Sequence, residues 1–126
     1  MFRNCTSLTK TAEIRDLNVG EEQCFKHMYR DCVSLTEAHD MKFNVLNIQS
    51  CYGMFRNCTS LTRAPRLLTV NVNKYGAYDF MFCDCTNLSY IECAMVCNSC
   101  LLGSENWVYG VSSSGTLVKN KLQTNY

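Results

Sequence analysis

Cysteine is the residue type of this chain with the most chemical potential, since ten of its 126 residues are cysteines. Three of them follow the spacing C-x3-C-x2-C, at Cys93, Cys97 and Cys100. With Cys83 or Cys85 nearby, they could supply four thiolates to a zinc ion. The spacing lacks a paired second knuckle, so a buried cluster or one disulfide is the competing interpretation. We expect no metal and no cofactor.

Histidine beside cysteine could also form a thiol hydrolase, in which an imidazole activates the nucleophile. The two histidines are His27 and His39, and Asp40 follows the second. Nothing in the sequence positions a thiol against them, and most of the thiols are expected to be buried and therefore poorly reactive. The GxGxxG, P-loop and HExxH motifs are absent. We expect a protein without catalytic residues.

An internal repeat positions the cysteines. The segment MFRNCTSLT occurs at 1–9 and again at 54–62, and the variants MYRDCVSLT and MFCDCTNLS begin at residues 28 and 81. Successive copies therefore begin 27, 26 and 27 residues apart. A fixed period of roughly 20 to 50 residues is the signature of a solenoid, in which no single repeat can bury its own hydrophobic face.

Apolar residues within each copy are three positions apart. This spacing lasts for only about ten residues, which favours a turn feeding a short strand over a helix. We expect one column each of aromatic, cysteine and leucine residues, with neighbouring copies roughly 4.8 Å apart as in a parallel sheet. The columns are Phe2, Tyr29, Phe55 and Phe82; Cys5, Cys32, Cys58 and Cys85; and Leu8, Leu35, Leu61 and Leu88.

The cysteine column bears on the redox state. Many cysteines in a short chain usually indicate a secreted disulfide scaffold. Stacked copies, however, would hold the Cβ atoms about 4.8 Å apart with parallel directions, wider than the roughly 3.5–4.5 Å of a disulfide. We therefore expect a ladder of buried, reduced thiols, in which cysteine acts as a small hydrophobic residue.

The length and the 47% hydrophobic content suit one solenoid domain over 1–126. A C-terminal cap is expected over about 90–120, followed by a loose tail at 121–126. In the cap, WVYGV and TLV flank the turn Ser112–Gly115 and predict a β-hairpin, with Trp107 covering the last repeat. Apolar residues between the copies should form the return side of each coil: Leu17 and Val19, Phe43 and Val45, Val70 and Val72.

Charge and hydropathy exclude some partners. Twelve Lys and Arg against eleven Asp and Glu leave a net charge of +1, which is not the global field that nucleic acid or an anionic membrane attracts. No signal peptide or membrane-spanning run is found in the sequence. The first copy starts at residue 1 and would leave Phe2 and Leu8 uncovered. We expect a fragment of a longer array, or self-association through this first copy.

Repeats of the form MFxxCTSLTxAP, with the single AP at Ala64 and Pro65, and the closing segment NWVYGVSSSGTLVKN resemble BspA-type leucine-rich repeat proteins. That resemblance implies a leucine-rich-repeat-type solenoid and a surface or adhesion role in anaerobic gut and oral bacteria. It implies binding of a protein or glycan on a host or another cell. The alternatives are a cytoplasmic or phage-associated location, and a structural spacer or end piece without a ligand.

Two rows of outward positions on the predicted strands are candidates for ligand binding. One row holds only hydroxyl residues and the other differs in every copy, as expected where a framework is kept while chemistry changes. Exposed strand positions also tolerate any residue, which is the alternative. The rows are Thr9, Thr36, Thr62 and Ser89, and Lys10, Glu37, Arg63 and Tyr90.

A column of like charges, Arg3, Arg30 and Arg56, is the third candidate site. Stacked guanidinium groups could clamp a polyanion through bidentate contacts. Alternatively, their heads point into water while their stems cover the coil. The residues beside them are expected to be turn formers: Asn4, Asp31, Asn57 and Asp84.

Overall fold

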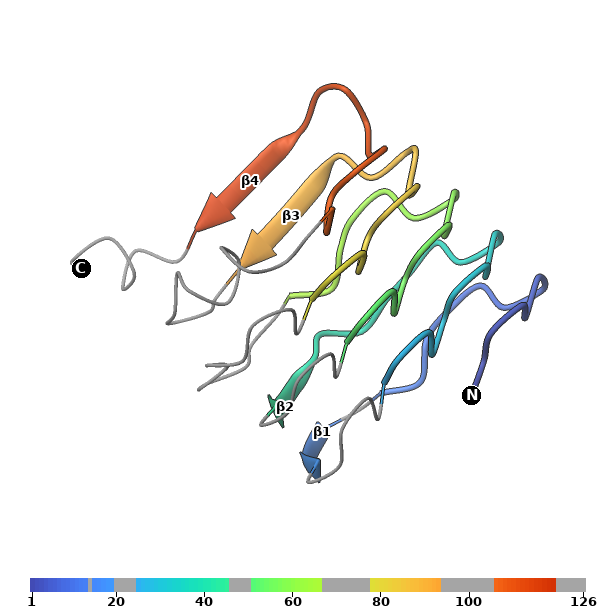
Figure 1. The fold of residues 1–126 in the computed structure, drawn as a ribbon, viewed down its shortest axis with the longest axis vertical. Helices are drawn as coiled ribbons and strands as arrows, with labels where there is room; N and C mark the ends of the chain where they lie inside the picture. The colour runs from blue at the N-terminus through green and yellow to red at the C-terminus, as the bar shows by residue number, and fades with distance from the viewer. Residues whose placement is uncertain (14, 20–24, 46–50, 67–77, 94–105, 120–126) are drawn as a thin grey trace.

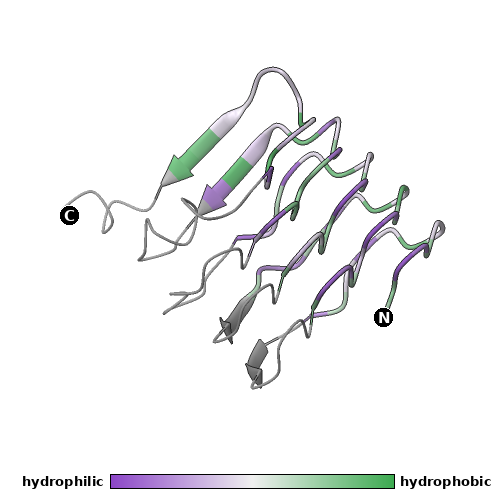
Figure 2. Cartoon of the chain, in the orientation of Figure 1, coloured by the Kyte–Doolittle hydropathy of each residue, from purple (hydrophilic) through white to green (hydrophobic). Residues whose placement is uncertain are grey.

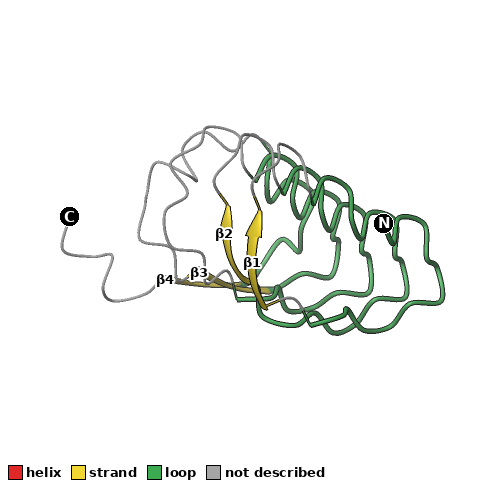
Figure 3. Ribbon diagram, turned by 90° about the horizontal axis from the view of Figure 1, so that it is seen from below, coloured by secondary structure: helices red, strands yellow, loops and turns green. Residues whose placement is uncertain are grey.

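The computed structural model describes residues 1–13, 15–19, 25–45, 51–66, 78–93 and 106–119. These residues contain the strands β1 (Arg15–Val19), β2 (Lys42–Val45), β3 (Tyr90–Cys93) and β4 (Thr116–Lys119). β1 pairs with β2, and β3 pairs with β4, each pair in parallel (Figure 1). The two pairs run in different directions (Figure 3). No described segment is a helix that could cross a membrane.

Consecutive tight turns explain the three-residue spacing of the motif. In the second copy the amides of Met28, Arg30, Cys32 and Leu35 each donate to the carbonyl oxygen three residues earlier, at 3.1–3.3 Å. Every third side chain therefore points to the same side. The expected turn formers are confirmed, because each adopts a left-handed φ of 60–62°: Asn4, Asp31, Asn57 and Asp84.

Successive copies lie on one another as layers, which we number one to five: 1–19, 25–45, 51–66, 78–93 and 106–119, described residues only. Amides of one layer donate to carbonyl oxygens of the next at equivalent positions, with distances of 2.8–2.9 Å. The first such bonds are Phe2 to Met28 and Asn4 to Arg30. Figure 2 shows apolar and polar stretches recurring from layer to layer. Backbone polar groups of the turns are thus paired between layers.

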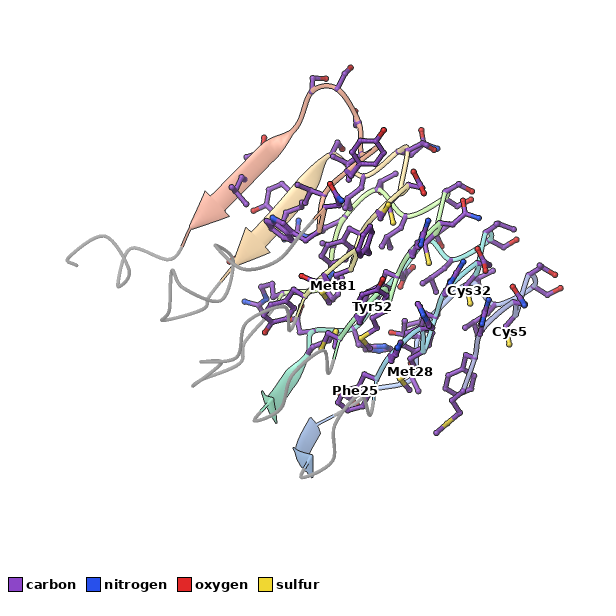
Figure 4. The ribbon with its side chains drawn as sticks, viewed as in Figure 1. Cys5, Phe25, Met28, Cys32, Tyr52 and Met81 are labelled. Atoms are coloured by element: carbon purple, nitrogen blue, oxygen red, sulfur yellow. The ribbon has the colours of Figure 1, made fainter. Side chains whose placement is uncertain are left out.

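Three columns of side chains fill the interior, as the sequence predicts. The rings of Phe2, Tyr29, Phe55 and Phe82 stack with centroids 5.4–5.6 Å apart and interplanar angles of 6–13°. The cysteine and leucine columns are fully buried in layers two to four and partly buried in layer one. Figure 4 shows Cys5 and Cys32 at equivalent places in neighbouring layers. The same or similar side chains thus contact one another from layer to layer in each column.

The expected C-terminal β-hairpin is wrong. Residues 106–110 form turns, and β4 pairs in parallel with β3 instead of antiparallel with residues 107–111. Phe82 and Asp84 donate to Trp107 and Tyr109, as Phe2 and Asn4 do to the second layer. The segment is therefore a fifth layer, in which Trp107 takes the place of Met81 and packs near Phe82. The tail and residues 94–105 of the expected cap lie outside the described residues.

The return side holds the paired strands β1 and β2. Leu17 lies opposite Phe43, and Val19 lies opposite Val45, with a register irregularity between Arg15 and Leu17. These are apolar residues that the sequence assigns to the return side of the coil. Val70 and Val72, the third such pair, lie outside the described residues.

Candidate functional site

The residues of the row that differs in every copy lie on adjacent layers and pair with one another in twos. Parallel bridges join Lys10 to Glu37 and Arg63 to Tyr90. The ammonium nitrogen of Lys10 is 3.5 Å from a carboxylate oxygen of Glu37. The guanidinium of Arg63 lies 4.2 Å from the centroid of the Tyr90 ring. The structure therefore brings the four residues together as two pairs.

A hollow of about 190 Å³ separates these two pairs. Glu37 turns toward Lys10, and Arg63 turns toward Tyr90 and Glu92, whose carboxylate is 3.7 Å away. Within the described residues, Glu37 and Arg63 thus form no ion pair with each other although their layers are adjacent. Opposite charges therefore face one hollow, lined by Thr36, Glu37, Ala38, Asp40, Arg63 and Ala64.

Asp40 and Arg66 close one side of this surface. The Asp40 carboxylate accepts two bonds from the Arg66 guanidinium, at 2.6 and 2.9 Å, and one from the Arg66 amide at 3.1 Å. These bonds hold the pKa of Asp40 below its ordinary value and raise the pKa of Arg66. The sequence did not lead us to pair Asp40 with Arg66, or to place Arg66 and Glu92 at this face. The spacing of Asp40 and Arg66 could have indicated their contact, because the two residues are one repeat period apart.

Hydroxyl groups of the uniform row bond to the backbone of the preceding layer. Thr36 donates to the Thr9 carbonyl oxygen at 3.3 Å, and Ser89 donates to the Thr62 carbonyl oxygen at 3.5 Å. The side chains stay exposed. The hydroxyl groups of Thr36 and Ser89 thus have a structural role, and the use of the row in ligand binding stays a prediction.

Two members of the arginine column lie beside carboxylates. Nε of Arg30 is 3.4 Å from Asp31, and Nε of Arg56 is 3.8 Å from Asp84 in the next layer. These contacts offset the repulsion between stacked arginines. Arg3 is exposed and has no ion pair within the described residues. At the corresponding place the fourth and fifth layers carry Cys83 and Tyr109, which are not cationic.

The thiol ladder makes regular hydrogen bonds. Cys32, Cys58 and Cys85 each donate through Sγ to the carbonyl oxygen of the aromatic residue one layer earlier, at 3.0–3.2 Å. The six cysteines that are described as free include all four members of the column. Burial raises the pKa of Cys58 far above its ordinary value and raises the pKa of Cys85 to about 12. These thiols are therefore poor nucleophiles.

Neither histidine is set against the thiol ladder. The His39 ring contacts Thr11, with Nδ1 2.8 Å from the Thr11 carbonyl oxygen, and the His39 amide donates to the Thr11 hydroxyl at 2.8 Å. Because a carbonyl oxygen only accepts, Nδ1 carries the proton. Asp40 is bound to Arg66 and does not orient this imidazole. These contacts are structural.

The metal-binding alternative concerns the cysteines near the C-terminus. Within the described residues, no group of three His, Cys, Asp or Glu side chains is arranged to hold a metal ion. Cys83 is buried and donates to Asp84 at 3.4 Å. Cys93 lies in β3, while Cys97 and Cys100 lie outside the described residues. The zinc and disulfide alternatives for that group stay predictions.

Comparison with known proteins identifies no relative. No protein-family model, curated protein or solved structure matches the chain.

Proposed function

We propose that the chain is a non-enzymatic binding module. Its fold would be a leucine-rich-repeat-type solenoid that presents an exposed strand face to a protein or glycan partner. The observation that carries this proposal is the row Lys10, Glu37, Arg63 and Tyr90, together with the hollow between Glu37 and Arg63. Extended surfaces of this kind are what repeat proteins use for recognition.

The buried positions of the layers keep their residue types while the outward position changes, and this difference supports the proposal. The buried columns keep nearly the same residues in layers two to four. The outward position holds a base, an acid, a base and an aromatic residue in turn. A pure spacer needs only solubility at that position, whereas binding needs side chains held in place. Lys10 and Arg63 are both held by neighbouring layers, by an ion pair and by a cation–π contact.

Chemistry of the hollow indicates the partner. An acid wall at Glu37 and a basic wall at Arg63 complement a partner that brings a basic group next to an acidic one. Such neighbouring charges are common on protein surfaces. A protein on another cell or host is the favoured partner, and a cell-surface location is proposed with it.

Binding arrays of host proteins and glycans test this function. We expect reproducible binding by the wild-type chain that is lost when Lys10, Glu37, Arg63 and Tyr90 are all changed to Ser. The matched control changes exposed turn residues to Ala at Thr6, Ser7 and Thr86, which should leave binding intact. Silence of the wild-type chain on every array would overturn the proposal and favour the structural spacer. Equal loss in the control would overturn the assignment of the face.

A further inference from the structure

Cationic and aromatic side chains gather on the turn segments, away from the strand face described above. We name this group the cation–aromatic edge: Arg3, Lys26, His27, Arg30, Tyr52, Arg56 and Phe80. The rings of His27 and Tyr52 meet edge to face with centroids 5.4 Å apart, and the rings of Tyr52 and Phe80 are 5.4 Å apart. The rings of this edge therefore run continuously over layers two, three and four, and Arg3 extends the edge into layer one.

Cations lie over the rings of this edge. The ammonium nitrogen of Lys26 is 5.2 Å from the centroid of Tyr52, and the guanidinium carbon of Arg56 is 5.6 Å from the centroid of Phe80. Both rings are partly exposed, as are the two cations. The rings hold the long basic side chains in place, so that less conformational entropy is lost when they bind an anion.

A glycine makes room for His27. Gly53 has a φ of 56°, and a Cβ atom there would lie 2.7 Å from Nδ1 of His27 and 2.9 Å from the neighbouring ring carbon. The imidazole consequently lies over the backbone of the next layer. Figure 4 places Tyr52 between the layers that carry Met28 and Met81.

Positive charge surrounds this imidazole. Burial lowers the pKa of His27, and the charges of Arg30, Arg3 and Lys26 lower it further, while the Gly53 backbone acts in the opposite direction. Nδ1 of His27 and Nε of Arg30 are buried without a hydrogen-bond partner, although Asp31 is close to the latter. Nε of Arg30 is therefore a buried donor that no acceptor in the described residues satisfies.

We propose that the cation–aromatic edge binds a sulfated polysaccharide. Guanidinium groups match sulfate oxygens in bidentate geometry, and Arg3 is exposed and without an ion pair in the described residues. The cations extend over three layers, so a chain with repeated anionic groups engages more of them than one small anion does. Tyr52 and Phe80, which are partly exposed, offer apolar surface to sugar rings beside these cations. This site is independent of the strand face.

Dextran sulfate is the probe, and unsulfated dextran of equal length is the matched control ligand. We expect titration calorimetry with the full chain to show binding of dextran sulfate only. The double variant Arg3→Gln and Lys26→Gln should bind about tenfold more weakly. A control variant with the same loss of charge in the strands β2 and β4, Lys42→Gln and Lys119→Gln, lies outside both candidate sites and should bind as the wild type does. Equal weakening in both variants would overturn the site, as would binding unaffected by the edge variant.

A second readout follows the His27 ring by NMR. A bound sulfate group next to the imidazole favours the protonated ring, so the pKa of His27 should rise on addition of dextran sulfate. The ring resonances of His39, which lies on the strand side, should not move. An unchanged His27 titration in the presence of saturating dextran sulfate would overturn the placement of the ligand. Thermal melting of both variants checks that each is folded.

Discussion

The thiol of Cys58 donates a hydrogen bond of 3.2 Å to the backbone carbonyl oxygen of Tyr29, one layer earlier. The same oxygen accepts the amide of Cys32 at 3.3 Å. One carbonyl group thus receives a backbone donor from its own layer and a thiol donor from the next. Cysteine suits this column because it combines a small apolar volume with a weak donor.

Replacing Cys58 by Val should destabilise the protein by about 1 kcal/mol, because the thiol donor is lost and the column must accommodate one more methyl group. Urea unfolding followed by circular dichroism measures the change. Val111 occupies the equivalent place in the fifth layer, so the valine is compatible with the turn. A variant as stable as the wild type would show that the thiol hydrogen bond contributes nothing.

Replacing Leu61 by Asp should abolish cooperative unfolding, because the side chain is fully buried and the charge would have no partner there. The adjacent variant Thr62→Asp places the same charge at an exposed position and should melt almost as the wild type does. Thermal melts of the two variants decide the matter. An unaltered melt for Leu61→Asp would contradict the leucine column.

Replacing Gly53 by Ala should cost about 1–3 kcal/mol, through its left-handed φ and the contact of the new Cβ with the His27 ring. Removing that ring in the double variant Gly53→Ala and His27→Ala should restore part of the loss. Denaturant unfolding of the two single variants and the double variant gives the coupling energy. If the losses of stability in the two single variants simply add up in the double variant, the His27 ring moves aside without cost and the loss in Gly53→Ala comes from backbone strain alone.

Alkaline pH should weaken the fold through the thiol ladder. The pKa of Cys85 rises from 9.0 to about 12 on folding, and the pKa of Cys58 also rises, because burial penalises the thiolate. The folded state therefore holds these protons more tightly than the unfolded state does. Stability should be constant below about pH 8 and should fall as the pH passes the ordinary thiol pKa. Unfolding curves at closely spaced pH values test this dependence.

Alkylation at neutral pH provides an independent check on the same thiols. Iodoacetamide should modify Cys58 and Cys85 in the unfolded chain much faster than in the folded chain, as read by peptide mass spectrometry. Cys5 is only partly buried and serves as the internal comparison. Rapid labelling of Cys58 in the folded chain would contradict its burial.

The four copies and their buried columns could be predicted because the repeat itself reports the packing. Every third residue of MFRNCTSLT points inward because the backbone makes successive three-residue turns. The period of 26 or 27 residues then aligns these positions between layers. The fold class named from the sequence, a leucine-rich-repeat-type solenoid, stays a prediction.

The fifth layer escaped prediction because its side chains differ from the motif. Trp107, Val108 and Val111 replace the methionine, the aromatic residue and the cysteine. What persists is a backbone property, namely left-handed residues four apart at Asn106 and Gly110, as at Phe80 and Asp84 in the fourth layer. Residue types reveal such a conformation only weakly, since His, Phe, Asp, Asn and Gly all adopt it in this chain.

The charged contacts of the candidate sites could be predicted only in part, for a different reason. Sequence position places Arg30 and Arg56 in one column, but it does not show that Asp31 lies beside Arg30 and that Asp84 of the next layer lies beside Arg56. Likewise, the turn of Arg63 toward Tyr90 and away from Glu37 depends on rotamers that the repeat does not specify.

Each layer bonds to its neighbours through the same backbone positions, and this regularity has an evolutionary consequence. The segments 1–9 and 54–62 are identical and lie two layers apart, so unequal crossing-over between them would add or delete two whole layers without disturbing the register of the others. The stability of stacked repeats is carried by contacts between nearest neighbours, so such changes are tolerated. The length of the stack can therefore change by whole layers, while the side chains that each remaining layer presents stay the same.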